Sequence, residues 1–81
     1  MAGPGAGGVQ HLLDVSELPP PEPLERVLDA LADLPAGDSL LVRLPMEPVL
    51  LYPMLRSMGM MWERNASPGG PVELLIWEPL A

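Results

Sequence analysis

The sequence predicts a two-layer α/β (α+β) sandwich with the element order βαβαββ, a four-stranded mixed sheet and two helices on one face. Residues 9–15, 39–44, 60–64 and 72–78 alternate apolar and polar side chains, as strands do. Two stretches with helical apolar spacing separate the first three strands, and a turn-rich segment, 65–70, indicates a hairpin between the last two. Each strand-helix-strand unit implies a right-handed crossover, and the hairpin implies one antiparallel strand.

The first helix is predicted from about residue 23 to residue 34. A proline-rich segment, 19–23, stops the first strand, and Pro23 fits a first helical position because its missing N–H removes no helical hydrogen bond. The apolar residues that follow fall on one stripe: Leu24, Val27, Leu28, Leu31 and Leu34. This stripe is expected to face the sheet.

The second helix is predicted to be short. Pro53 would cost about 3 kcal/mol deep inside a helix but almost nothing in its first turn, so the helix should begin near Leu50 or Leu51. It should end at Met58, with Gly59 as a left-handed cap. Before it, the strand 39–44 should direct Leu40, Val42 and Leu44 inward.

Composition limits the chemistry that the chain can perform. Its 81 residues and 8.7 kDa fit one domain, expected at 9–81 after a flexible tail at 1–8 that has no basic secretory signal. No apolar run reaches the ~18 to 20 residues that span a bilayer. The absence of cysteine excludes disulfides, thiolate metal sites and thiol redox chemistry, and the cytoplasm is the expected compartment. A net charge of −7 disfavours nucleic acid as a partner.

Residues 13–24, LDVSELPPPEPL, resemble the opening motif of the TusA/SirA-like sulfur-carrier domains, in which a Cys-Pro-x-Pro motif begins the first helix. The chain is more similar to a cysteine-free branch, domain of unknown function 2249, over roughly residues 12–79. The positions that match its motif blocks are Leu13, Asp14, Pro20, Pro21, Glu22, Pro23, Glu47, Pro48, Leu51, Tyr52, Gly59 and Trp62.

The resemblance implies a TusA-like fold that has lost sulfur transfer, because Pro20 stands where those carriers have the cysteine. Met46 and Leu50 depart from the branch's second block, where a histidine and a second proline are typical. A thioether cannot titrate, so any ligand or proton-carrying role of that histidine is lost here. The branch often occurs beside respiratory and denitrification proteins. This association implies an alternative function: the chain would be an accessory domain of a respiratory or nitrogen-oxide enzyme system and would bind a metal or a small ligand.

Few residues could act in catalysis. The chain has one histidine, four serines and one tyrosine, with no cysteine, threonine or lysine, so we expect no enzyme activity and no cofactor. His11 and Glu47 are weak candidates for a metal site, and His11 is more simply interpreted as a partly buried structural residue on the inner face. Met54, Met58 and Met60 are expected to fill the core beside Trp62 rather than bind copper.

The sheet face away from the helices is the predicted binding surface. Alternation directs Val72, Leu74 and Ile76 toward the helices and places an apolar patch on the other side, made of Leu41, Met61, Leu75 and Trp77. Monomers seldom leave such a patch bare, so a homodimer or a partner protein is expected to cover it. The alternative is a pocketed tryptophan beneath the N-terminal tail or scattered apolar residues. The predicted function is therefore a small non-catalytic interaction module.

Overall fold

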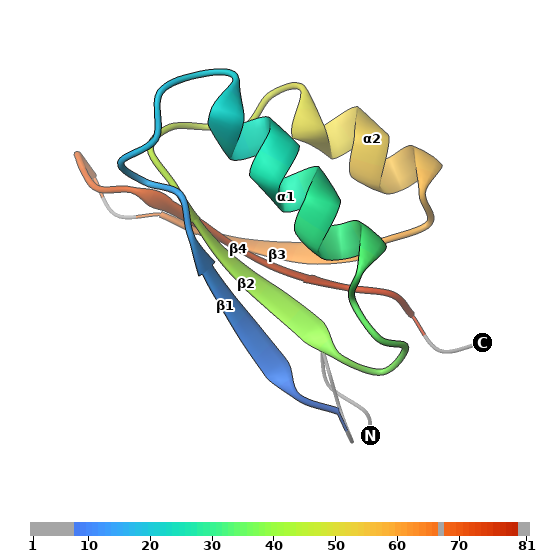
Figure 1. Cartoon of the computed structure of the whole chain (residues 1–81). Coiled ribbons are helices and arrows are strands. Elements are labelled where there is room, and N and C mark those ends of the chain that lie inside the picture. Colours follow the sequence, from blue (N-terminus) through green and yellow to red (C-terminus); the bar gives the residue numbers. More distant parts are fainter. Residues whose placement is uncertain (1–7, 67, 80–81) are drawn as a thin grey trace.

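A computed structural model describes residues 8–66 and 68–79, and all of the predicted tail except Gly8 lies outside the described residues. The elements follow the predicted order and are β1 (Gln10–Asp14), α1 (Glu22–Ala32), β2 (Ser39–Leu44), α2 (Leu51–Ser57), β3 (Met61–Ala66) and β4 (Val72–Trp77). The strands form one four-stranded sheet, and both helices cover the same face of it (Figure 1). The predicted two-layer fold is confirmed.

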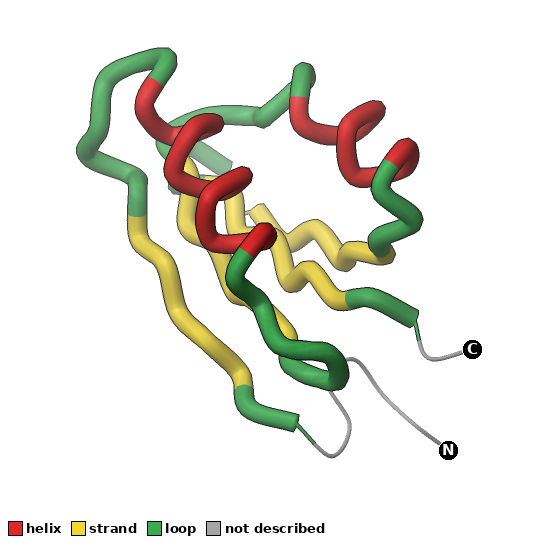
Figure 2. The backbone as a smooth tube through the Cα atoms, turned by 45° about the vertical axis from the view of Figure 1, so that its right-hand side comes forward, coloured by secondary structure: helices red, strands yellow, loops and turns green. Residues whose placement is uncertain are grey.

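The sheet is mixed, and its last strand in sequence lies in its interior. Strand order is β1-β2-β4-β3, with β1 parallel to β2 and with β4 antiparallel to both β2 and β3. Figure 2, turned by 45°, shows the two helices together on one side of the strands. Neither α1 nor α2 lies on the opposite side, so strand alternation decides which side chains of the described strands it presents.

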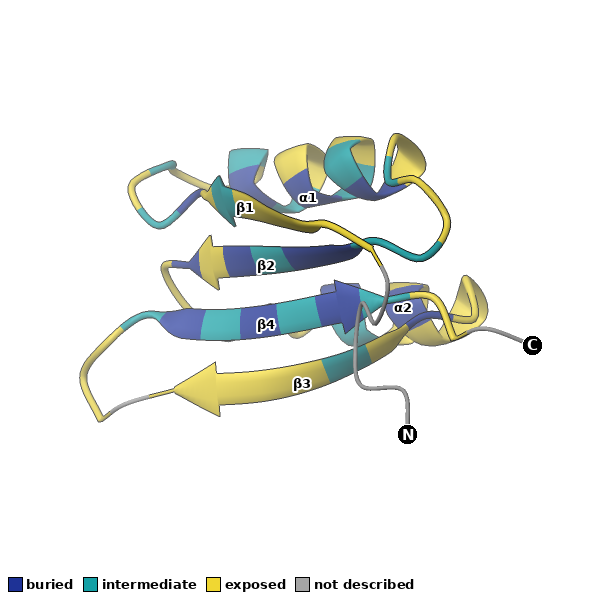
Figure 3. Cartoon of the chain, turned by 90° about the horizontal axis from the view of Figure 1, so that it is seen from below, coloured by how far each residue is buried: buried dark blue, intermediate teal, exposed yellow. Residues whose placement is uncertain are grey.

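The core lies between the sheet and the helices. Val27 and Leu31 of α1 belong to the predicted stripe and are buried, and Leu51 and Leu55 of α2 are buried as well. From the sheet they meet the predicted inward residues, Leu40, Val42 and Leu44 of β2 and Val72, Leu74 and Ile76 of β4, all buried. Figure 3 shows buried positions concentrated on β2 and β4, while β1 and β3 at the edges are largely exposed.

Both helices differ slightly from the predicted bounds. Helix α1 begins one residue before Pro23 and ends at Ala32 rather than at 34. The earlier end follows from Pro35, which disfavours helical backbone at Leu34; the Leu34 N–H instead closes a short turn on the Leu31 carbonyl at 3.2 Å. Helix α2 begins at Leu51, as Pro53 requires. Gly59 has a φ of +75°, the left-handed conformation predicted for the cap.

The expectation that Met54 and Met58 fill the core is wrong. Their side chains are 38% and 45% exposed, whereas Met60 is 9% exposed and does pack in the core. Helix α2 has only seven residues, and Leu51 and Leu55 already occupy its buried face. The two methionines therefore lie on the outer side of the helix.

The edge-strand bounds also shift. Strand β3 runs to Ala66 instead of ending at residue 64, because its antiparallel pairing with β4 continues to the Ala66–Val72 pair. Strand β4 ends at Trp77, and β1 is one residue shorter than predicted at each end. Neither described helix has the length and apolar character needed to cross a lipid bilayer.

Candidate functional site

The open sheet face presents the four predicted patch residues on one side. Leu41 of β2 and Leu75 of β4 are Cα partners on the two central strands. Trp77, two residues after Leu75 on β4, is the Cα partner of Met61 on β3. Leu41, Leu75 and Trp77 are half-buried, and Met61 is 50% exposed. Figure 3 views this face, with the strands in front of the helices. The structure thus brings the predicted patch together.

Leu12 extends this patch and was not included in the predicted set. It pairs with Leu41 in the parallel β1–β2 ladder, so Leu12, Leu41 and Leu75 form one apolar row across three strands. Its side chain is 73% exposed. The strand alternation that separates Leu12 from Leu13 would have identified it from the sequence.

A charged row borders the apolar row. Asp14, Arg43, Glu73 and Asn65 are successive partners across the four strands, and the Arg43 Nε lies 3.8 Å from a Glu73 carboxylate oxygen. The Ser16 hydroxyl and, to a smaller extent, the Ser16 backbone N–H donate hydrogen bonds to the Asp14 carboxylate, and these bonds lower the pKa of Asp14. The open face therefore combines an apolar centre with a salt-bridged margin.

The family-type motif residues gather elsewhere, around Glu47 in the β2–α2 connection. The Tyr52 hydroxyl donates a hydrogen bond to Glu47 Oε2. The guanidinium of Arg64 on β3 donates to the same carboxylate, with its Nε 2.9 Å from both oxygens and its Nη2 2.5 Å from Oε1. The ring of Tyr52 stacks on Trp62, with centroids 5.6 Å apart and planes at 27°. Three separate segments thus meet at one carboxylate.

These contacts shift the ionisation of each polar group. The hydrogen bonds from Arg64, and then the one from Tyr52, lower the pKa of Glu47. Burial, reinforced by the neighbouring Glu47 carboxylate, raises the pKa of Tyr52 to about 12. Hydrogen bonding to Glu47 raises the pKa of Arg64. At neutral pH the cluster is a fully paired carboxylate, guanidinium and neutral phenol, with no group placed to exchange a proton.

Next to this cluster lies a groove of about 370 Å³ between the segment that precedes α1 and the segment that joins β2 to α2. The motif residues Pro20, Pro21 and Pro23 line one wall, and Glu47 and Pro48 contribute to the other. The remaining motif residues have local roles: Leu13 packs against the core, Asp14 binds Ser16, and Glu22 is the first residue of α1.

The sequence matches a known protein family. The family model described as Uncharacterized conserved protein (DUF2249) matches residues 12–78, which include all three motif blocks. The chain belongs to this family. No curated protein and no solved structure matches it.

In this DUF2249 member, two positions of the motif blocks, Pro20 and Met46, carry side chains without a reactive or titratable group. Pro20 is an exposed proline on the groove wall, and Met46, the residue before Glu47, is 63% exposed at the groove rim. Neither side chain can act as a nucleophile toward carbonyl carbon or transfer a proton. The lining of the groove is mostly apolar, and Glu47 is its one ionisable residue.

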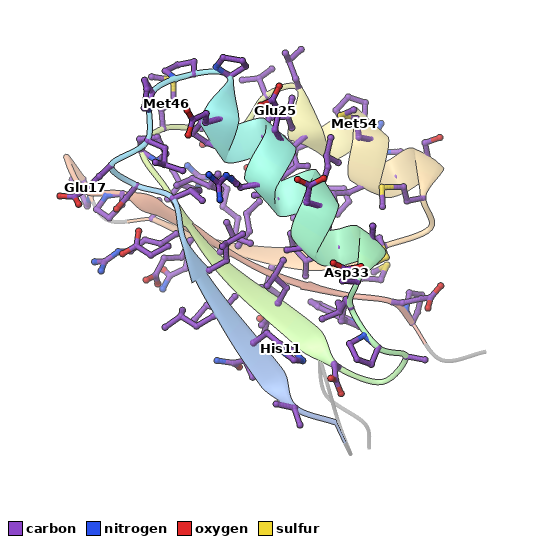
Figure 4. The ribbon with its side chains drawn as sticks, in the orientation of Figure 1. His11, Glu17, Glu25, Asp33, Met46 and Met54 are labelled. Atoms are coloured by element: carbon purple, nitrogen blue, oxygen red, sulfur yellow. The ribbon has the colours of Figure 1, made fainter. Side chains whose placement is uncertain are left out.

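His11 and Glu47, the weak metal candidates, are not brought together. His11 pairs with Leu40 near the start of β2, whereas Glu47 follows the end of that strand. In Figure 4, His11 and Met46, the neighbour of Glu47, lie at opposite ends of the sheet. Among residues 8–66 and 68–79, no three histidine or acidic side chains are grouped so as to hold a metal ion.

The expectation that His11 is partly buried is also wrong. The residue is exposed, and its Nε2 lies 2.7 Å from Asp38 Oδ2, whose pKa this contact lowers. Asp38 also accepts a hydrogen bond from the backbone N–H of Val9 through Oδ1 at 2.9 Å. The pair therefore fastens the start of β1 to the turn before β2, which is a structural role.

Proposed function

We propose that the chain is a non-catalytic interaction module whose open sheet face docks on another protein chain, and that this chain is a second copy of itself. The observation that supports the proposal is the continuous apolar row Leu12, Leu41 and Leu75, with Trp77 and Met61 beside it, on a face that no described element covers. Aromatic and aliphatic side chains of this kind form the centres of protein interfaces.

The fold is proposed to be TusA-like without the sulfur-carrier function. The element order and the proline-rich entry to α1 support this relationship, and Pro20 in place of a cysteine removes the thiolate that persulfide transfer requires. An acidic, cysteine-free domain needs no oxidising compartment, so we propose a cytoplasmic location.

The charged row favours a second copy as the occupant. A two-fold axis parallel to the strands and between β2 and β4 would lay β2 of one copy over β4 of the other. Leu41 would then face Leu75 of the second copy, and Arg43 would face its Glu73, twice in a symmetric interface. The two central strands are thus complementary to themselves in both apolar contact and charge, whereas Leu12 at the edge would face Glu63 of the second copy. Aligned packing of this type is common between sheets.

The size of the open sheet face determines how strongly two copies are expected to associate. Four strands spaced ~4.8 Å apart, of which β1 has five residues and β2, β3 and β4 have six, give a surface of roughly 19 Å by 20 Å. Two such faces cover roughly 760 Å² of flat area, which is below the ~1,200 Å² of standard specific interfaces and in the range of weak, transient ones. We therefore expect a reversible dimer whose population rises with protein concentration.

A charge exchange tests the arrangement. The variants R43E and E73R should each be monomeric at concentrations at which the unaltered chain dimerises, because each places like charges opposite one another. A 1:1 mixture of the two should dimerise again, since two negative positions on one copy then face two positive positions on the other. Sedimentation velocity over a concentration series measures all four samples.

Three further variants complete this experiment. The same charge reversals on the exposed side of α1, R26E and E25R, should leave dimerisation unchanged, whereas the double variant L75K/W77S should abolish it. An unaltered chain that stays monomeric at high concentration, or a mixture that fails to associate, would contradict the second copy as occupant. Retained dimerisation of L75K/W77S would exclude the open face as the interface.

A further inference from the structure

The groove beside the Glu47 cluster has an unusual shortage of hydrogen-bond donors. Five of its lining residues are prolines, which have no backbone N–H: Pro20, Pro21, Pro23, Pro45 and Pro48. The other lining residues, apart from Glu47, are Leu24, Leu44, Met46, Val49, Leu50 and Leu51, and none has a polar side chain. A ligand that needs donors to satisfy a carboxylate or phosphate would find few of them here.

Glu47 is the one ionisable residue of the lining, and its carboxylate is already occupied. Oε1 accepts from Arg64, and Oε2 accepts from both Arg64 and Tyr52. A cationic ligand group would have to displace an internal bidentate ion pair in order to bind this carboxylate. The lining therefore has no free polar side chain to fix a charge of either sign.

The apolar side chains around the groove are exposed to solvent. Met46, Val49 and Leu50 are 63%, 68% and 70% exposed, although all three lie in the one short connection between β2 and α2. Burying such side chains under a ligand would stabilise a complex by about 25 cal/mol per Å² of apolar area. Met46 adds an unbranched side chain that can adapt to different shapes.

We propose that this groove is a binding site for a neutral, apolar small molecule. Its volume of about 370 Å³ falls at the small end of the range typical of small-molecule pockets, roughly 300 to 1,000 Å³. The missing donors and the chain's net charge of −7 both disfavour anions. The site shares no residue with the open sheet face, so this inference is independent of the proposed self-association.

A pair of fluorescent probes tests the ligand class. Nile red is neutral and apolar, whereas 8-anilinonaphthalene-1-sulfonate is aromatic and anionic. We expect saturable Nile red binding with a blue-shifted emission, and binding of the sulfonate that is weaker by on the order of tenfold, which corresponds to about 1.4 kcal/mol. Equal or tighter binding of the sulfonate would overturn the proposed ligand class.

A near-isosteric variant locates the binding. The triple variant M46Q/V49T/L50N keeps the approximate side-chain shapes of the rim but makes them polar, and it should weaken Nile red binding on the order of tenfold. The matched control V9T/M54Q/M58Q makes the same kind of change at exposed residues outside the groove and outside the open sheet face, and it should bind as the unaltered chain does. Equal binding by both variants would overturn the assignment to the groove.

Nuclear magnetic resonance of the unaltered chain gives a result that does not depend on the folding of any variant. With methionine ε-methyl labelling, Nile red should shift the resonance of Met46 in the groove and leave Met54 and Met58 of the outer helix surface unchanged. Met61 reports on the open sheet face. A shift confined to Met61 would place the ligand on the sheet and overturn the proposal.

Discussion

At the scale of single residues, Glu47 is the most highly connected polar group of the described chain, and its contacts lock Tyr52 in the neutral form. Tyr52 is the chain's one tyrosine, so its ionisation can be followed without overlap from another phenol. The carboxylate that accepts its hydrogen bond also opposes the formation of phenolate beside it.

We expect Tyr52 to ionise at about pH 12 in the folded chain, against an ordinary value of 10.0, as measured by tyrosinate ultraviolet absorbance. Because the folded pKa is raised, the phenol contributes stability fully below pH 10, and this contribution is lost as the pH rises through about 12. The variant E47Q should lower the pKa only partly toward 10, since burial remains the larger cause. Ionisation of the unaltered chain near pH 10 would contradict this assignment.

The sequence predicted individual residues well wherever alternation decided their environment. Leu41, Leu75 and Trp77 lie on the predicted face because a strand directs alternate side chains to opposite sides. It predicted Met54 and Met58 poorly, because on a short helix the spacing i, i+4 marks one face without indicating which face is buried. The contact of Arg64 with Glu47 joins residues 17 apart in sequence, and no local pattern encodes it.

At the scale of elements, α2 depends on very few contacts. Its seven residues bury only Leu51 and Leu55, and a helix of this length is not stable by itself in water. Its position over the sheet is therefore decided by these two leucines, by the Gly59 turn that ends it, and by the Tyr52–Trp62 stack.

We expect Leu55→Ala to reduce the free energy of unfolding by about 2 to 5 kcal/mol, because Leu55 is fully buried and the deletion leaves a cavity in the core. Met54→Ala removes a side chain of similar size from the same helix, but one that is 38% exposed, and it should cost less than about 1 kcal/mol. Urea unfolding with an unchanged m value measures both. Similar losses from the two variants would contradict the assigned faces of α2.

The existence and type of every described element could be predicted, whereas the ends were less certain. Proline and glycine mark boundaries through backbone chemistry, which is why Pro53 and Gly59 placed the ends of α2 closely. The end of β3 depends instead on how far it pairs with β4, and that pairing is a tertiary property.

At the scale of the whole molecule, charge and apolar contact oppose one another in self-association. Each copy carries a net charge of −7, so two copies repel at long range. The Arg43 and Glu73 pairs proposed at the interface are exposed, and such pairs contribute only about 0 to 1 kcal/mol each. The general repulsion is therefore expected to exceed the gain from the local pairs.

We accordingly expect the dissociation constant of the dimer to fall as salt is added. Screening shortens the reach of the repulsion from about 10 Å at 0.1 M to about 3 Å at 1 M, while burial of the apolar row is not weakened. Sedimentation equilibrium across a sodium chloride series measures this change. Weaker association at high salt would show that ion pairs, rather than the leucine row, hold the copies together.

The element order of the molecule could be predicted, but the strand order and the convergence of the motif blocks required the structure. The hairpin signal places β3 and β4 together without stating which of them lies beside β2. The groove forms because the carboxyl ends of parallel β1 and β2 meet at one edge, which brings the connection after each strand into contact. The spacing of residues along the chain does not predict this contact between the two connections.

The interior position of β4 has a consequence for biosynthesis. Until β4 has left the ribosome, β2 and β3 have no strand between them, and a nascent chain that ends before residue 72 can form only the β1–β2 pair of this sheet. At translation rates of about 5 to 20 residues per second the wait is short, but during it the edge of β2 that pairs with β4 has no partner strand. Completion of this fold is therefore a late event, triggered by the arrival of its last strand.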